Sequence, residues 1–189
     1  FDSSGGLFSY SMAGHGGVRN SAVAGDGHTG SITFVADGDI DFNAQGGNGA
    51  FVMAGHGGYQ SVGNHGAATD VISLNAGGFV GVDAGLGDGA FAMIGNGGYD
   101  ADNDTFLEPA FNPTDAPVQL DLADNTPVTL RGDIDVTTGT GGLTVRGGQN
   151  GAANSLHAFA QVGHGGFDTT GSNGAGVPSF MGDIDIEVG

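Results

Sequence analysis

A ten-residue segment that occurs four times constrains the fold of this chain more than any other feature. Each copy carries an aromatic residue in an apolar stretch, followed by glycine, then histidine or asparagine, then two glycines and one final apolar or aromatic residue. The copies cover residues 9–18, 50–59, 90–99 and 158–167. The glycine before the histidine or asparagine falls at positions 14, 55, 95 and 163, so successive steps are 41, 40 and 68 residues. The chain is therefore a repeat protein.

The two middle copies show how far the repetition extends. A shift of 40 residues carries residues 31–59 onto residues 71–99, so that apolar positions fall on apolar positions and glycines on glycines. Ile32, for example, falls on Ile72, and Gly38 falls on Gly78. Units of this size with matching apolar positions bury their faces by stacking on their neighbours. The pattern predicts an all-β fold, a parallel β-helix (β-solenoid) with coils of about 40 residues.

The unit at residues 31–59 predicts three strands in each coil. Apolar residues alternate with polar ones at 31–34 and at 39–42, which is typical of strands with one buried face. The third strand covers residues 50–54, and the following Gly-His-Gly-Gly is expected to form a turn that closes the unit. With 41 glycines in 189 residues, helices are not expected, because glycine costs about 1 kcal/mol relative to alanine inside a helix.

The third strand is apolar on both of its faces. Phe51 and Met53 lie on one face, and Val52 and Ala54 lie on the other. A strand of this kind is usually buried on both sides. Two interpretations remain open: the loop after Gly-His-Gly-Gly folds back over the strand through Tyr59 and Tyr99, or this face contacts another chain.

The period breaks after the third copy. Residues 99–117 are rich in aspartate and proline and show no alternation, so we expect a loop insertion within a single solenoid segment that covers residues 1–189. Short strand candidates between residues 118 and 145 suggest an additional, shortened coil. Because the first and last residues fall inside repeat units, we expect the segment to continue in a longer chain.

Two ladders of equivalent residues follow from the stacking. The four aromatic residues of the copies are expected to form a core ladder: Tyr10, Phe51, Phe91 and Phe159. The polar residues between the glycines are expected to form a turn ladder: His15, His56, Asn96 and His164. Stacked imidazoles suggest a metal ladder, but histidine and asparagine are both common at positive φ, and Asn96 is a poor zinc ligand, so the sequence favours a tight structural corner. His28 and His65 lie in loops without regular spacing.

A calcium site is the only cofactor that the sequence suggests. Asp100, Asp102 and Asp104 place three carboxylates on one loop, which is a ligand set suited to calcium. The segment lacks the glycine and the bidentate glutamate of an EF-hand, since Thr105 and Phe111 stand at those places. A solvated acidic loop is the alternative, and the sequence favours it.

The charge of the chain excludes several classes of partner. Three arginines and no lysine stand against 21 acidic residues, which gives a net charge of −18. Nucleic acid and anionic membranes are therefore not expected as partners, and no apolar run is long enough for membrane insertion as a helix. No Ser/His/Asp or Cys/His arrangement is supported by spacing, so we expect a protein that is not an enzyme.

The motifs together resemble a known family. The repeated copies, the tetrapeptide Gly-Asp-Ile-Asp and the stretch Gly-Gly-Leu-Thr-Val-Arg-Gly-Gly at 141–148 resemble the repeat regions of large secreted bacterial exoproteins of the filamentous-haemagglutinin type. The resemblance spans most of the chain outside 99–117. It implies a β-helix that is exported to the cell surface or the medium and acts in adhesion, biofilm matrix or filament building.

The expected function is therefore that of a non-enzymatic, structural or adhesive extracellular solenoid. Its expected partners are further copies of itself, in a homo-oligomer or self-polymer, or the continuation of a longer chain, together with surface glycans. The alternative is a carbohydrate-binding or carbohydrate-cleaving β-helix, which requires an acidic cleft between adjacent coils.

Overall fold

The computed structural model describes residues 1–3, 6, 8–18, 27–45, 47–61, 63–99, 129–148, 157–167, 169 and 180–189. Within these segments every regular element is a β-strand, and no helix is present. Every pair of strands for which a register is defined runs parallel. The prediction of an all-β fold with parallel strands is confirmed.

The strands form five parallel sheets. The outer sheet contains, in spatial order, β16 (Ile184–Val188), β12 (Asp133–Thr138), β7 (Val71–Ala76) and β3 (Ile32–Ala36). The lower sheet contains β13 (Leu143–Arg146), β8 (Val80–Asp83) and β4 (Ile40–Asn43). The inner sheet contains β1 (Tyr10–Ala13), β5 (Phe51–Ala54), β9 (Phe91–Ile94) and β14 (Phe159–Val162). The glycine sheet contains β10 (Gly97–Tyr99), β6 (Gly57–Tyr59) and β2 (Gly16–Val18), and β11 (Leu130–Arg131) pairs with β15 (Phe180–Met181).

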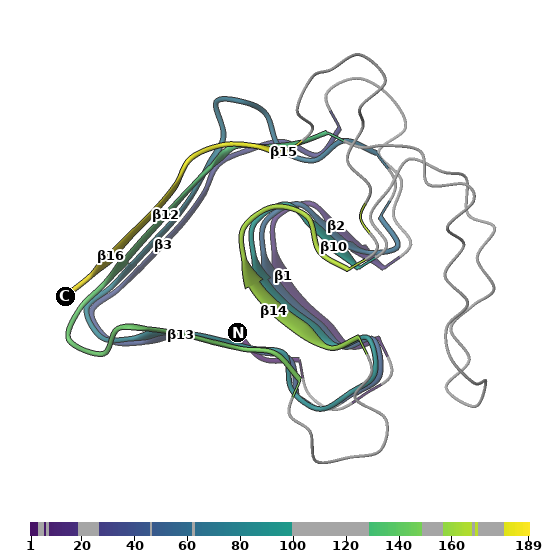
Figure 1. The fold of residues 1–189 in the computed structure, drawn as a ribbon, viewed down its shortest axis with the longest axis horizontal. Coiled ribbons are helices and arrows are strands. Elements are labelled where there is room, and N and C mark those ends of the chain that lie inside the picture. The colour runs from purple at the N-terminus through teal and green to yellow at the C-terminus, as the bar shows by residue number, and fades with distance from the viewer. Residues whose placement is uncertain are drawn as a thin grey trace.

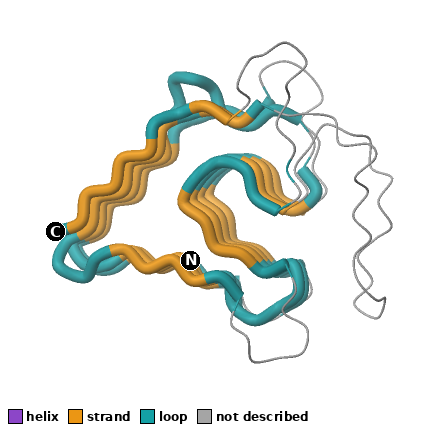
Figure 2. Tube along the Cα trace, in the orientation of Figure 1, coloured by secondary structure: helices purple, strands orange, loops and turns teal. Residues whose placement is uncertain are grey.

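The chain follows the same circuit several times. In each passage it runs through the outer sheet, turns into the lower sheet, returns through the inner sheet and then bends through the glycine sheet (Figures 1 and 2). Segments that are far apart in the sequence therefore lie side by side, one passage next to the other. In this arrangement the backbone N–H and C=O groups of a strand pair with those of the neighbouring passages. The partners come from other passages because a tight hairpin cannot join parallel strands.

The register between passages is the one that the sequence shift predicts. Ile32 pairs with Ile72 in the outer sheet, and Phe51 pairs with Phe91 in the inner sheet. Tyr59 pairs with Tyr99 in the glycine sheet. A slip by one residue would move every apolar side chain to the opposite face of its strand, so burial of one face fixes the register.

The passages at residues 32–59 and 71–99 each contain four strands, not the predicted three. The segment expected to be a closing turn, Gly57–Tyr59, is strand β6, and it pairs in parallel with both β2 and β10. Gly57 has φ of 126°, and a Cβ at this residue would lie 2.0 Å from the carbonyl oxygen of Gly97. The close approach of neighbouring backbones requires glycine here, so an extended strand forms from residues that otherwise indicate a turn.

The apolar side chains form two separate clusters. The first lies between the outer sheet, the lower sheet and one face of the inner sheet, and it includes Ile72, Val80 and Val52. The second lies between the other face of the inner sheet and the glycine sheet, and it includes Phe51, Met53 and Tyr59. Every residue of β5 and β9 is buried. The first of the two interpretations is therefore confirmed: the chain folds back over its own third strand through Tyr59 and Tyr99.

The region after the third copy differs from the prediction of an additional coil. β12 pairs directly with β7, β13 with β8, and β14 with β9. No strand of the described segments lies between these pairs, so β12, β13 and β14 belong to the passage that directly follows β7, β8 and β9. Tyr99, the first residue of the expected insertion, is the last residue of β10. Residues 100–117 lie outside the described residues.

We predict that Gly97→Ala destabilises the protein by about 3 kcal/mol or more, because Gly97 has φ of 122° and a Cβ there would lie 2.1 Å from the carbonyl oxygen of Gly165. The control is Gly38→Ala, where an added Cβ meets nothing within 4 Å. Its effect should stay within about 0.5 kcal/mol. Urea unfolding followed by circular dichroism measures both changes. Equal stability of the two variants would contradict the close stacking of the glycine sheet.

Candidate functional site

The turn ladder joins successive passages through side-chain hydrogen bonds. The N–H of His15 donates to Nδ1 of His56 at 3.0 Å, and the N–H of His56 donates to Oδ1 of Asn96 at 2.8 Å. The N–H of Asn96 then donates to Nδ1 of His164 at 3.2 Å. Each side chain thus accepts a hydrogen bond from the equivalent residue of the preceding passage.

The opposite end of each side chain bonds to the segment that leads into the outer sheet. Nε2 of His56 lies 2.8 Å from the carbonyl oxygen of Gly30, and Nε2 of His164 lies 2.7 Å from that of Gly132. Nδ2 of Asn96 donates to the carbonyl oxygen of Arg131 at 2.7 Å. Because a carbonyl only accepts, these partners assign the hydrogen of the neutral imidazoles to Nε2 and leave Nδ1 as the acceptor.

These bonds explain why either histidine or asparagine can occupy this position of the repeat. Both offer an acceptor close to the backbone and a donor further out, so the amide of Asn96 makes bonds of the same two kinds as the imidazole of His56. Asn96 donates to Arg131 of the next passage, whereas His56 bonds to Gly30 of its own passage. The reason given by sequence analysis, positive φ at the ladder residues, is wrong. Positive φ falls on flanking glycines such as Gly55 and Gly57, and none of the ladder residues has it.

Burial favours the neutral form of His56 and of His164. It lowers the pKa of His56, an effect to which the nearby His15 ring adds, while the Gly30 carbonyl and Asp70 oppose it. Burial also lowers the pKa of His164, against the influence of the Gly132 carbonyl and Asp133. A neutral ring is what the geometry requires, since protonation at Nδ1 would remove the acceptor that the neighbouring passage uses.

A second pair of histidines lies beside the ladder, and sequence analysis missed it. Nδ1 of His28 and Nδ1 of His65 are 3.2 Å apart, and the rings stack with centroids 5.2 Å apart. Burial, with a contribution from the His28 ring, lowers the pKa of His65 to about 3. The spacing of 37 residues between them differs from the repeat period, so only the parallel bridge between the two loops reveals the pair.

Two imidazoles of the turn ladder are poorly placed to bind a metal ion. Nδ1 of His56 and Nδ1 of His164 accept backbone N–H groups, which occupies the lone pairs that a metal would need. Across the described segments no group of three or more histidine, cysteine, aspartate or glutamate side chains could hold a metal ion. Asp100, Asp102 and Asp104 lie outside the described residues, so the calcium site stays a prediction.

The core ladder lies on the face of the inner sheet that contacts the glycine sheet. Its ring centroids are separated by 5.0 Å from Tyr10 to Phe51, 4.7 Å from Phe51 to Phe91 and 5.1 Å from Phe91 to Phe159. The planes are within 5° of parallel in all three pairs. These separations match the distance between neighbouring strands, so the sheet spacing itself stacks the rings.

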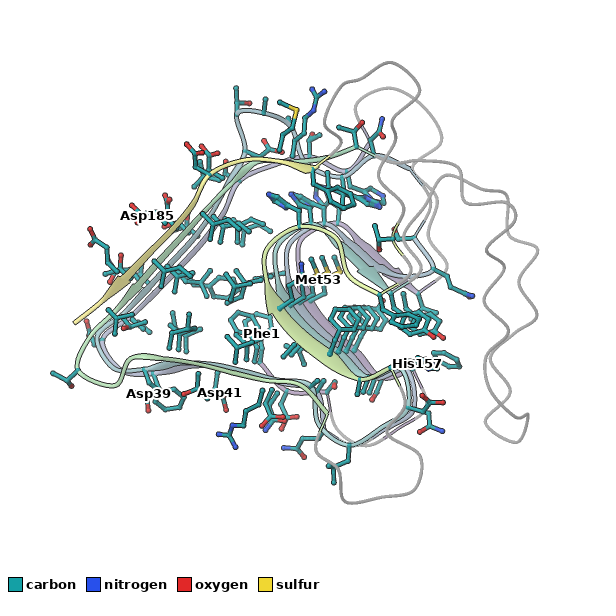
Figure 3. The ribbon with its side chains drawn as sticks, viewed as in Figure 1. Phe1, Asp39, Asp41, Met53, His157 and Asp185 are labelled. Atoms are coloured by element: carbon teal, nitrogen blue, oxygen red, sulfur yellow. The ribbon has the colours of Figure 1, made fainter. Side chains whose placement is uncertain are left out.

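Side chains on the first and last described strands of the stack are more exposed than their equivalents in the interior. Tyr10, on the edge strand β1, is 51% exposed, whereas Phe51 in the next passage is fully buried. At the other end of the stack, in the outer sheet, Ile184 and Ile186 on β16 are exposed, whereas Ile134 and Val136 on the neighbouring strand β12 are buried. Asp185, between these two, lies on the outside of the outer sheet (Figure 3). The inward-facing rows of the stack are therefore less buried on the first and last described strands than in the interior.

In comparisons with known proteins, no family model, no curated protein and no solved structure matches this chain. Among the described residues, no helix has the length and apolar character needed to cross a membrane.

We predict that His56→Asn preserves the fold at neutral pH, because Asn96 shows that an amide makes both ladder bonds. His56→Ala should lower the free energy of unfolding by about 2 kcal/mol or more, since the His15 N–H and the Gly30 carbonyl lose their partner. Chemical unfolding of the two variants in parallel measures the difference. An asparagine variant as unstable as the alanine variant would refute the equivalence of the two side chains.

We predict that the protein loses stability as the pH falls from about 6.5 towards 3. The pKa values of His56, His65 and His164 are lowered in the fold, so the unfolded chain binds these protons at a higher pH than the folded chain does. Within this window each such histidine contributes a slope of about 1.4 kcal/mol per pH unit, until the folded protein is protonated as well.

The matched control for the pH dependence is the double variant His56→Asn/His164→Asn. It removes two titrating groups and keeps the ladder bonds, so its free energy of unfolding should fall less steeply with acidification. Urea unfolding at a series of pH values compares the two proteins. Identical slopes would show that the ladder histidines do not determine the acid sensitivity.

Proposed function

We propose that this chain is a stretch of a β-solenoid, a parallel β-helix with coils of about 40 residues, that serves as a structural and adhesive element outside the cell. The observation that carries the proposal is the continuity of the ladders. The aromatic row from Tyr10 to Phe159 and the polar row from His15 to His164 cross every passage without interruption. Such rows supply rigidity along the stacking direction.

The chemistry of the described residues supports a role without catalysis. The side chains that most often act as general bases, the histidines, are committed to structural contacts at His56, His65 and His164. Their lowered pKa values follow from burial within the stack, which is the common structural origin of such shifts. A protein with these features is suited to hold a shape and present surfaces.

The outward-facing residues support an extracellular setting as part of the same proposal. Asp135 and Asp185 lie next to each other in register on the outer sheet, and Thr137 lies next to Glu187. Paired carboxylates repel by about 1 kcal/mol at water's dielectric constant, and dissolved salt screens this repulsion. A surface of this kind, in a chain of net charge −18, fits a salt-rich medium. Export and adhesion rest on the resemblance to filamentous-haemagglutinin-type exoproteins, and surface glycans and calcium remain proposed partners.

We predict that one whole period can be deleted without loss of the fold. Removal of residues 51–90 joins Ala50 to Phe91, and it places β9 next to β1 with every row preserved. Because a solenoid depends on contacts between neighbouring passages, the shortened protein should fold cooperatively and lose about 4.8 Å along the stacking axis. Circular dichroism and small-angle X-ray scattering measure these properties.

The control for the deletion removes half a period, residues 51–70. It joins the lower sheet of one passage to the outer sheet of the next, so the inner sheet loses a strand and the rows no longer match. This variant should be unfolded or markedly less stable. If the whole-period deletion fails in the same way, the fold depends on a unique core and the solenoid proposal is wrong.

An assay for polysaccharide cleavage distinguishes the structural role from the carbohydrate-cleaving alternative. If the role is structural, no reducing ends should be released when the protein is incubated with a panel of acidic and neutral polysaccharides. Binding without turnover supports the adhesive part of the proposal. Specific cleavage of one polysaccharide would overturn the non-enzymatic role.

A further inference from the structure

The pair of His28 and His65 belongs to a row of the stack that is apolar in the following passages. A parallel bridge joins His28 to His65, and a second one joins His65 to Leu130 of the next passage. Leu130 is fully buried, and it pairs in turn with Phe180 of β15. The row therefore suits an apolar side chain, and packing alone does not require histidine at positions 28 and 65.

The pair lies where two irregular segments meet. We call residues 27–30, which lead into β3, and residues 63–70, which lead into β7, the crossing segments. The N–H of His28 donates to the carbonyl oxygen of Asn64 at 3.1 Å, and the N–H of Gly66 donates to the carbonyl oxygen of His28 at 2.7 Å. Because the crossing segments lie outside the five sheets, they can open locally while the sheets stay paired.

The facing Nδ1 atoms of the two rings share a single hydrogen. They are 3.2 Å apart, so one Nδ1 donates and the other accepts. A proton added to the donor ring enters at its Nε2 and leaves this bond intact. A second proton has to enter at the Nδ1 of the acceptor ring, which places two hydrogens and two positive charges against each other. The closed pair therefore loses its hydrogen bond when both rings are protonated.

The surroundings of both rings disfavour the charged form. Burial lowers the pKa of His65 to about 3, and the rings of His28 and His56 add to this effect, while the Ser61 backbone opposes it. Burial also lowers the pKa of His28, with contributions from the rings of His56 and His15. When the crossing segments open, both pKa values return towards the ordinary value of about 6.5. The open form therefore binds protons at a higher pH than the closed form does.

The other charged groups nearby do not compensate a charge on the pair. Oδ2 of Asp70 accepts the N–H groups of Gly30 and Ala67, both at 2.8 Å, so this carboxylate holds backbone groups of the crossing segments. Arg131 on β11, whose N–H donates to the carbonyl oxygen of His65 at 3.0 Å, adds a positive charge on the neighbouring strand. Among the described residues, none of the groups that shift the pKa values of the pair is a carboxylate.

We propose that the pair of His28 and His65 is a pH-sensitive latch, which holds the crossing segments together at neutral pH and releases them in acid before the sheets separate. The equilibrium constant for opening should rise about tenfold per pH unit for each histidine that is protonated only in the open form. For His65 this range extends from about 6.5 down to about 3. The latch goes beyond the proposed structural role, because it gives the stack a part that responds to acidity.

Amide hydrogen exchange of the full chain, resolved by NMR and corrected for the intrinsic effect of pH, tests the latch between about pH 7 and about pH 4. The N–H of Gly66 reports on the crossing segments. The N–H of Phe91, which donates to the carbonyl oxygen of Ala50 at 3.0 Å, reports on the inner sheet. The protection of Gly66 should fall about tenfold or more per pH unit, and Phe91 should stay the better protected of the two at every pH.

The matched control is the double variant His28→Leu/His65→Leu, which gives both positions the side chain of Leu130 in the same row. Because both partners are replaced together, no polar group of the pair is left unpaired. The variant should keep Gly66 protected at neutral pH, and its protection should fall with acid about tenfold less per pH unit than in the unchanged protein. Equal pH dependence in the two proteins would overturn the inference. Loss of Gly66 protection in the variant at neutral pH would also overturn it, as would equal protection of Gly66 and Phe91 throughout.

Discussion

The close parallel approach of one passage of the chain to the next is the constraint on which the rest of the structure depends. Neighbouring strands must lie about 4.8 Å apart to share backbone hydrogen bonds. Every position therefore meets its own equivalent, and the side chain there must tolerate a like neighbour. Aromatic rings do so by stacking, as Phe51 does on Phe91 at 4.7 Å. Glycines do so by having no Cβ, as Gly57 shows beside Gly97.

Polar residues meet the same constraint by donating to one neighbour and accepting from another. His56 receives the N–H of His15 and gives its own N–H to Asn96, while its Nε2 bonds to the carbonyl of Gly30. The turn ladder thus connects the inner and glycine sheets to the segment that enters the outer sheet. At this place His56 is buried, and burial lowers its pKa. Because the turn ladder requires neutral imidazoles, the stability of the stack depends on pH.

Much of this fold could be predicted from the sequence, because a repeated register carries its own evidence. The pairing of Ile32 with Ile72 and of Tyr59 with Tyr99 follows from a 40-residue shift alone. Strand β6 could not be predicted, since Gly57 and Gly58 indicate a turn unless the neighbouring backbone is known. The pairing of His28 with His65 could not be predicted either, because the loops that carry these residues do not follow the repeat period. The role of Asn96 required the geometry of its two hydrogen bonds.

The most direct test of the stacked ladder is NMR detection of couplings across its N–H···N hydrogen bonds in uniformly ¹⁵N-labelled protein. The structure predicts coupling between the backbone nitrogen of His15 and Nδ1 of His56, and between that of Asn96 and Nδ1 of His164. It also predicts imidazole ¹⁵N shifts of the neutral Nε2–H form for both rings. Missing couplings together with shifts of the Nδ1–H or charged form would contradict the account, because the ladder could not then join one passage to the next.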